Sequence, residues 1–153
     1  MRRLEVVGAR AENLVARVAR RHGLTHAALN ALAVIEGNGG PLPVGEVGAR
    51  MHITSGTMTT VLDTLERNQL VRRVADPADR RRVLVDITPA AADVLDRMLP
   101  EVQQVATAAM GALDEEALVS FLEMLAVLDA SIAAVPEELP PPAARRTPPH
   151  LRR

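Results

Sequence analysis

The chain contains a single aromatic side chain, Phe121, among its 153 residues. Apolar residues make up 48% of the sequence, so a hydrophobic core can form. Ala, Val, Leu, Ile and Met have to fill that core, and these side chains suit packed helices better than an aromatic-rich barrel or sandwich. The composition therefore predicts a mostly α-helical fold, and the length fits one compact domain with an appended arm.

Several classes of protein are excluded or disfavoured by what the sequence lacks. The absence of cysteine excludes disulfides, thiolate metal sites and thiol redox sensing. The first residues hold no long apolar run between their charges, so no secretory signal is expected. No stretch approaches the run of about eighteen apolar residues that a membrane span requires. We therefore expect a cytoplasmic protein with no membrane partner.

Charge is segregated along the chain, although the formal net charge is only −1. Five arginines fall between residues 72 and 82, whereas residues 86 to 138 hold eleven acidic side chains and one arginine, Arg97. Such a chain can present a cationic surface to phosphates and an acidic body elsewhere. Solvated surface charge is the alternative interpretation for any single arginine, and it explains the cluster less well.

Helical periodicity dominates the N-terminal part of the chain. Apolar residues at steps of three and four predict a first helix that ends at His22-Gly23. The apolar residues that share one side of this helix, its seam, are Leu4, Val7, Ala11, Leu14 and Val18. Thr25 is placed to cap a second helix, which the glycines from Gly37 onward stop.

Two short helices follow, and together they have the pattern of a helix-turn-helix. The first begins after Pro43 and makes about two turns. Thr54 is then placed to cap the second, which runs from Ser55 to about Asn68. A separation of three or four residues between the helices is typical of a helix-turn-helix, but helical hairpins in general share it.

A β-hairpin is predicted directly after these helices. Residues 70–74 and 82–87 are β-prone, and residues 75–81 between them contain Asp-Pro and several charges, which favour a turn. The tip of this hairpin is basic. A basic hairpin that follows a helix-turn-helix is a wing, and that order is far more specific than either part alone.

The C-terminal part is predicted to form two further helices and a tail. Thr88-Pro89 opens a long helix, in which Pro100 should cause a kink or a local break. Asp114 and the two glutamates after it start the last helix. Residues 136–153 hold six of the eleven prolines and no apolar periodicity, so we expect a flexible Pro/Arg-rich tail there.

An ordered series of motifs runs through the helix-turn-helix and the wing. The motifs are Ile53-Thr54-Ser55-Gly56-Thr57-Met58-Thr59, Leu62-Asp63-Thr64-Leu65-Glu66-Arg67, Leu70-Val71-Arg72-Arg73, Asp76-Pro77-Ala78-Asp79-Arg80-Arg81 and Val83-Leu84-Val85-Asp86-Ile87-Thr88-Pro89. With them, residues 24–100 resemble the multiple-antibiotic-resistance regulator (MarR) family of winged helix-turn-helix transcription regulators. The resemblance implies a homodimer, with residues 1–23 and 89–135 as a helical dimerisation body and residues 24–88 as the DNA-binding domain.

The apolar pattern supports dimerisation independently, because three helices carry long seams that one small domain cannot bury completely. The residues expected at the dimer interface are Leu4, Val7, Leu14, Val18, Leu118, Phe121, Leu125 and Leu128. The first helix is lined with arginine and the last helices are acidic, so we also expect charge pairing across the two chains.

The helix that begins at Ser55 is expected to enter the major groove of DNA with its N-terminal end. The residues assigned to this contact are Ser55, Gly56, Thr57, Thr59 and Thr60, whose hydroxyls and methyls can meet base edges. Capping and ordinary surface polarity are the alternative interpretation. Thr60 and Thr64 stand where family members often carry Arg, and Gln69 replaces a frequent Gly, which shifts the expected left-handed cap to Asn68.

The wing supplies the second group of expected DNA contacts, namely Arg72, Arg73, Asp79, Arg80 and Arg81. By resemblance, Arg81 reaches into the minor groove, whose negative potential attracts arginine. Asp79 either orients this arginine or stabilises the turn. Arg72 and Arg73 lie on alternate strand faces, so we expect one of the two to meet phosphate.

The resemblance implies a sequence-specific double-stranded DNA-binding transcription regulator, expected to act as a repressor on a palindromic operator. A small-molecule effector is a further expected partner, and its identity stays open. A winged helix that binds proteins without touching DNA is the alternative, and the basic wing argues against it. No arrangement of catalytic residues points to an enzyme. His22 and His26 are separated by Gly23, which favours surface histidines over a metal site, so no metal or cofactor is expected.

Overall fold

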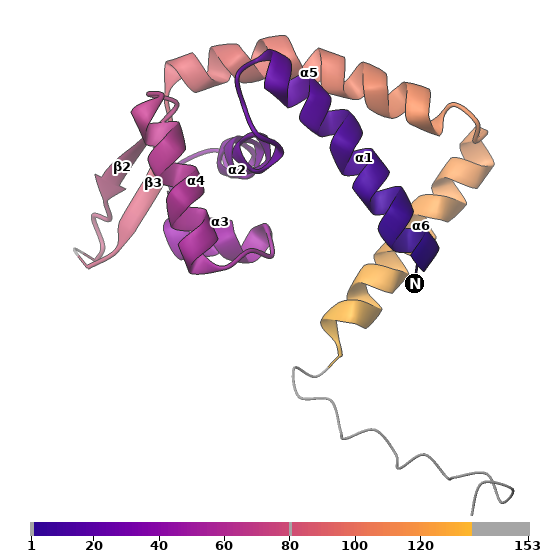
Figure 1. The fold of residues 1–153 in the computed structure, drawn as a ribbon. Helices are drawn as coiled ribbons and strands as arrows, with labels where there is room; N and C mark the ends of the chain where they lie inside the picture. Colours follow the sequence, from indigo (N-terminus) through magenta and orange to yellow (C-terminus); the bar gives the residue numbers. More distant parts are fainter. Residues whose placement is uncertain (1, 80, 136–153) are drawn as a thin grey trace, which may run out of the picture. The chain divides into compact units, whose positions relative to one another are not determined.

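A computed structural model describes residues 2–79 and 81–135, and Figure 1 traces their elements along the chain. The elements are α1 (Arg2–Arg21), α2 (His26–Gly37), β1 (Leu42–Pro43), α3 (Val44–Arg50), α4 (Ser55–Arg67), β2 (Val71–Ala75), β3 (Val83–Ile87), α5 (Pro89–Met110) and α6 (Glu115–Ala133). The chain divides into two units, and the boundary along the sequence falls between Ala109 and Met110. The predicted tail, residues 136–153, lies outside the described residues.

The predicted helix starts are confirmed by side-chain caps. Thr25 Oγ1 accepts a hydrogen bond from the backbone N–H of Ala28 at 3.1 Å. Thr54 Oγ1 does the same for Thr57 at 3.3 Å, at the start of α4. Each cap satisfies a backbone donor that the first turn of a helix leaves without a partner. Short polar residues therefore set where these helices begin.

Helix α5 runs without interruption from Pro89 to Met110, so of the kink or local break predicted at Pro100 the break does not occur. Proline removes one backbone donor from the helix and leaves the carbonyl of Asp96, four residues earlier, without its usual partner. Asp96 is exposed, so water can satisfy that carbonyl. The cost is therefore small enough for the helix to continue.

The end of α4 corrects a second prediction. The left-handed residue is Gln69, with φ of +59°, whereas the expected Asn68 has φ of −85°. The N–H of Gln69 donates to the carbonyl of Glu66, and the N–H of Leu70 donates to that of Leu65 at 2.9 Å. This pair of bonds is a Schellman motif, which requires the left-handed conformation one residue after the cap. Bond geometry therefore overrides the greater tolerance of asparagine for this conformation.

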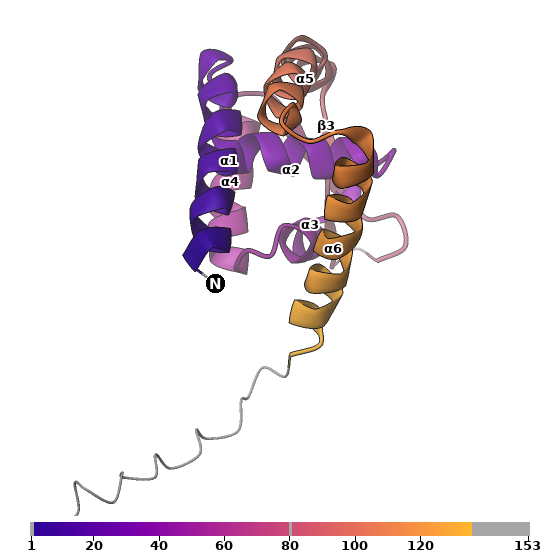
Figure 2. The same ribbon diagram turned by 90° about the vertical axis from the view of Figure 1, so that its right-hand side faces the viewer.

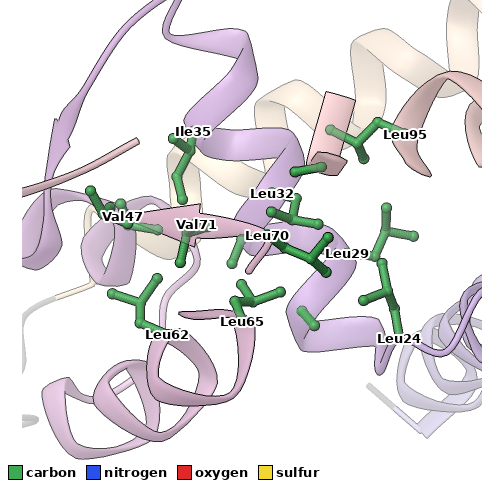
Figure 3. Packing of buried hydrophobic residues seen from close by; sticks show 14 of the residues in the cluster. Leu24, Leu29, Leu32, Ile35, Val47, Leu62, Leu65, Leu70, Val71 and Leu95 are labelled. Carbon is green, nitrogen blue, oxygen red and sulfur yellow. The ribbon is translucent and has the colours of Figure 1, made fainter. Parts of the chain in front are cut away.

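Helix α2 lies at the centre of the first unit, with α5 on one side and α3 on the other (Figure 2). Its apolar residues Leu29, Leu32 and Ile35 pack with residues of α4, the sheet and α5 in one core (Figure 3). The other labelled members of this core are Leu24, Val47, Leu62, Leu65, Leu70, Val71 and Leu95. The helix-turn-helix and the hairpin therefore share one packed interior.

The hairpin belongs to a three-stranded antiparallel sheet in the order β1-β3-β2. Strands β2 and β3 form the predicted wing, with Val71 opposite Ile87 and Arg73 opposite Val85. The two-residue strand β1 was not predicted, and it pairs Leu42 with Val85. This pairing ties the segment before α3 to the base of the wing.

One residue, Val18, was wrongly predicted to lie at the dimer interface. Val18 has 0% relative exposure and is part of the core of the first unit. A seam at helical spacing shows which side of a helix is apolar but not what covers each turn. The last turns of α1 pack on their own chain, so Val18 is not available to a partner.

In the second unit, α6 begins at its predicted cap, because Asp114 Oδ1 accepts from the N–H of Ala117 at 2.8 Å. None of the residues of this helix is buried. No helix among residues 2–79 and 81–135 is long and apolar enough to cross a membrane.

Candidate nucleic-acid interface

The outer face of α4 is presented to solvent because the opposite face is anchored in the core. Met58, Leu62 and Leu65 are buried, with relative exposures of 1% or less. The five residues predicted to contact bases all lie on the exposed side, namely Ser55, Gly56, Thr57, Thr59 and Thr60. The structure therefore brings these residues together at the N-terminal end of one helix.

Hydrogen bonds within α4 decide what its threonines can offer. Thr59 Oγ1 donates to the carbonyl of Ser55 at 2.9 Å, and Thr60 Oγ1 donates to that of Gly56 at 3.2 Å. A hydroxyl that has given its proton to its own helix keeps its lone pairs and its methyl group for an outside partner. Thr59 and Thr60 can therefore accept hydrogen bonds from base amino groups and contact thymine methyls, while their own hydroxyl protons are already donated within the helix.

The C-terminal half of α4 is different, because it is acidic on its exposed flank. Asp63 and Glu66 lie three residues apart, which places them on the same side of the helix. The nearby Arg67 donates instead to the carbonyl of Asp63 and to Thr64 Oγ1. The helix therefore changes from a polar, uncharged end to an end that carries two carboxylates.

Arg73 pairs with both of these carboxylates. Its Nη2 lies 2.6 Å from Asp63 Oδ1, and its Nη1 contacts Glu66. Hydrogen bonding to Asp63, with a smaller contribution from the charge of Glu66, raises the pKa of the Arg73 guanidinium above its ordinary value. The side chain is 32% exposed, and both terminal nitrogens of its guanidinium are engaged by these carboxylates.

Arg72 faces the other way, as the alternation of strand faces predicts. It pairs with Asp86, which lies directly across the hairpin, at 2.6 Å from Nη2 to Oδ2. Its side chain is 65% exposed. Of the two strand arginines, Arg72 is therefore the more exposed.

The wing tip is organised by two aspartates that accept hydrogen bonds from the backbone. Asp76 Oδ1 accepts from the N–H of Ala78 at 2.8 Å, and Asp79 Oδ1 accepts from that of Arg81 at 2.9 Å. Asp79 thus stabilises the turn, which was one of its two expected roles. Arg81 is exposed at the tip, and no acidic side chain among the described residues forms an ion pair with it. Arg80 lies outside the described residues.

The histidines of the α1–α2 region have separate partners. His22 Nε2 lies 3.0 Å from Glu101 Oε1 on α5, and the same carboxylate accepts from Arg21 at 3.2 Å. His26 contacts Asn30 at 3.4 Å. In the described part of the chain no group of three or more acidic, histidine or cysteine side chains could hold a metal ion.

A polar helix held against a core and a hairpin with an exposed arginine at its tip define a winged helix-turn-helix. Residues 22–82 match the model of the MarR family. The chain is 30% identical over 105 residues to the HTH-type transcriptional regulator MhqR of Bacillus subtilis. These aligned residues cover 69% of this chain and 72% of MhqR. The chain belongs to the MarR family.

Two further proteins illustrate the relationship. The HTH-type transcriptional repressor NicR of Pseudomonas putida is 31% identical over 86 residues, which cover 56% of this chain and 54% of NicR. The chain spans about half the length of several curated relatives that it matches. A crystal structure of a MarR variant from E. coli, complexed with operator DNA, shares the fold with a TM-score of 0.77 at 21% identity, over 83% of this chain and 91% of that chain. The matched relatives are named as regulators of transcription, not as enzymes.

Sequence reasoning missed the ion pairs between Arg73 and α4. The signal was present, because Asp63 and Glu66 share a helix face that directly precedes a strand with two arginines. The strand alternation could separate Arg72 from Arg73 but did not show which of them faces α4.

Proposed function

We propose that this protein is a sequence-specific double-stranded DNA-binding transcription regulator that represses as a homodimer on a palindromic operator. The observation that carries the proposal is the wing tip, where Arg81 is exposed on a turn that Asp76 and Asp79 stabilise. This tip belongs to the same unit of the chain as the exposed polar end of α4. MarR, whose fold this chain shares, has been crystallised with operator DNA.

In this proposal, the N-terminal end of α4 enters the major groove. Thr59 and Thr60 contribute acceptor lone pairs and methyl groups, and Gly56 allows the helix backbone to approach the bases closely. The free backbone N–H groups of the first turn favour contact with a phosphate. Base readout by this helix depends on shape and on weak polar contacts, since no cation lies among its exposed N-terminal residues.

The wing supplies the cationic contact that α4 lacks. Arg81 enters the minor groove, where a narrow A·T-rich segment has an enhanced negative potential. Arg72, which keeps 65% of its side chain exposed, is placed to meet a phosphate beside the groove. Two such readers on a two-fold axis recognise half-sites about ten base pairs apart.

Dimerisation is proposed from the apolar surface of α1 and α6. Leu4 and Val7 on α1 are 42% and 60% exposed, and Leu125 and Leu128 on α6 are 37% and 38% exposed. Leu14, Leu118 and Phe121 are partly buried and add to the same seams. An apolar helix without a buried residue needs a partner to cover it, and a second copy supplies complementary seams. We assign residues 1–23 and 89–135 to this function and residues 24–88 to DNA binding.

Charge on the same helices supports pairing between two copies. Helix α1 carries Arg3, Arg10 and Arg17, whereas α6 carries Glu115, Glu116, Glu123 and Asp129 and no basic residue. If these charges meet across the dimer, dimer affinity falls as salt is raised. Sedimentation equilibrium at low and high salt measures this, and a dissociation constant that does not change with salt would contradict the pairing.

A small-molecule effector is part of the proposal as the means of release from DNA. A cavity of about 180 Å³ lies between the start of α2 and α4, and its lining includes Leu24, Thr60 and Thr64. A ligand there would press on the same helix that we assign to base readout. Because the proposed target is chromosomal DNA, we expect the protein to act in the cytoplasm.

The decisive experiment is selection of fragmented genomic DNA from the source organism with the purified full chain. We expect enrichment of fragments that share a palindrome, and binding of an enriched duplex that weakens steeply as salt is raised. A matched duplex with a scrambled palindrome is the control. Equal binding of both duplexes, or recovery of no fragment, would contradict the proposal.

A further inference from the structure

Residues 24–88, which we assign to DNA binding, are called the reader below. Arg73 connects two parts of the reader, α4 and the wing, that must work together. It lies on β2 opposite Val85, within the wing hairpin. Its guanidinium contacts Asp63, at 2.6 Å, and Glu66, and both carboxylates are on α4. A single side chain of the wing thus bridges two side chains of the helix that we assign to the major groove.

The neighbouring Arg72 shows what is particular to this position. Arg72 pairs with Asp86 directly across the hairpin, so its ion pair connects two strands of the same wing. The Arg73 pairs instead connect the wing to a different element. The two arginines are adjacent and both are ion-paired, yet only Arg73 restrains the wing relative to α4.

The other connections between α4 and the wing lie at the base of the hairpin. Asn68 and Gln69 form the short turn, and Leu65, Leu70 and Val71 pack in the core beneath it. These contacts hold the buried start of β2. Arg73 lies two residues further along the strand, on the same face as Val71, so its bridge extends the junction between α4 and the wing beyond the core.

We propose that Arg73 is a positioning residue that fixes the angle between α4 and the wing, and that it does not contact DNA itself. This inference rests on the proposed DNA-binding function. With the angle fixed, the end of α4 and Arg81 reach adjacent grooves at the same time. Arg73 also offsets part of the negative charge of Asp63 and Glu66, two carboxylates that would otherwise repel the phosphates beside α4 more strongly.

Loss of this bridge affects specific binding more than non-specific binding. An operator site requires α4 and the wing to be seated together, and preorganisation of the two removes an ordering cost from the complex. Binding to random duplex DNA depends on phosphate contacts, which each part makes separately. The ratio of the two affinities therefore reports the positioning role.

The test is a double-mutant cycle on the full chain, with the duplex recovered by genomic selection and a random-sequence duplex as probes. Arg73→Met removes the charge but keeps an apolar stem of similar length. We expect it to weaken binding of the selected duplex by about tenfold and to lower the specificity ratio. In a background with Asp63→Asn and Glu66→Gln, the same change should alter affinity by less than about twofold.

Two matched variants separate positioning from direct contact. Arg72→Met removes the adjacent arginine and should cost the same affinity in both backgrounds, as should Arg81→Ala. A direct phosphate contact by Arg73 would give an equal loss in both backgrounds and reduce the salt dependence by about one contact, and this result would overturn the proposal.

Unfolding in urea gives a readout that needs no DNA. Coupling between Arg73 and the two carboxylates in the free protein supports the bridge, whereas additive effects refute it. If Arg73→Met lowers stability but leaves the affinity of the folded protein unchanged, the positioning role is refuted. If genomic selection recovers no fragment, the proposed function fails, and the unfolding cycle alone decides whether the bridge exists.

Discussion

Leu32, Leu62 and Val85, which belong to residues 24–88, are completely buried in the core of the first unit, whereas α6 buries none of its nineteen residues. Both regions are rich in aliphatic side chains, so composition does not explain the difference. In the first unit, α4, the sheet and α5 pack around α2, and these elements cover one another's apolar faces. Helix α6 presents apolar side chains around most of its circumference, which is typical of a helix completed by another chain. The comparison predicts that the two regions respond differently to substitution.

The largest effect is expected from a double substitution on α6, Leu125→Asp with Leu128→Asp. Two carboxylates on an apolar seam would be buried without partners in the proposed dimer. We expect the dissociation constant of the dimer to rise by about a thousandfold or more, and operator binding to be lost with it. Sedimentation equilibrium measures the first effect and fluorescence anisotropy the second.

The matched control for this variant is Ser120→Asp, which adds a carboxylate to an exposed polar position of the same helix. It should leave the dimer intact. The far-ultraviolet circular dichroism of the double variant should keep the signal of a folded reader, because α6 contributes no residue to that core. A double variant that remains fully dimeric would contradict the assignment of α6 to the dimer interface.

The reader should show the opposite response. Leu62→Ala leaves a cavity at a position with 0% exposure between α4 and the rest of the core. Substitutions of this kind cost about 2–5 kcal/mol of the free energy of unfolding. Thermal or urea unfolding measures the loss, and Leu122→Ala, at a side chain on α6 that is 56% exposed, is the control. A loss for Leu122→Ala as large as that for Leu62→Ala would show that α6 also contributes a core within one chain.

The difference between the regions also limits what the sequence could predict. Local signals were sufficient for the helix starts, because the caps Thr25, Thr54 and Asp114 act within three residues of their partners. The wing followed from β-prone segments around an Asp-Pro turn. Strand β1 was missed because its two residues form a strand only through pairing with the distant β3. Long-range partners carry no local signature.

In the candidate site, too, features set by local spacing could be predicted, and features set by long-range packing could not. Exposure of the N-terminal face of α4 could be predicted from the spacing of Met58, Leu62 and Leu65, which anchors the opposite face. The burial of Val18 and the bridge from Arg73 to Asp63 could not, because each depends on which element packs alongside. Predictions about faces therefore succeeded where predictions about partners did not.

Arg81→Ala should separate the functions of the two regions. We expect operator binding to weaken by about 1–3 kcal/mol, because a minor-groove contact is lost, while the dimer is unchanged. Anisotropy titrations at fixed salt measure the affinity. Arg97→Ala, an exposed arginine on α5 outside the reader, is the charge-matched control. Equal affinities for wild type and Arg81→Ala would argue against the wing assignment.

The smallest effect is expected at the junction between α4 and the wing, where Gln69 is held at φ of +59°. Glycine adopts this conformation without the penalty of about 1–2 kcal/mol that a side chain carries. The greater freedom of glycine in the unfolded chain costs about 0.5–1 kcal/mol in return. Gln69→Gly should therefore raise the free energy of unfolding by about 0.5–1 kcal/mol, as measured by urea denaturation.

The adjacent residue provides a control that reverses the sign. Asn68 has φ of −85°, a value that any side chain adopts without strain, so glycine there brings only the entropic cost. Asn68→Gly should lower the free energy of unfolding by about 0.5–1 kcal/mol. Neither substitution touches α6, so neither should change the dissociation constant of the dimer. Destabilisation by Gln69→Gly would show that the glutamine side chain makes a contribution larger than the strain of its backbone.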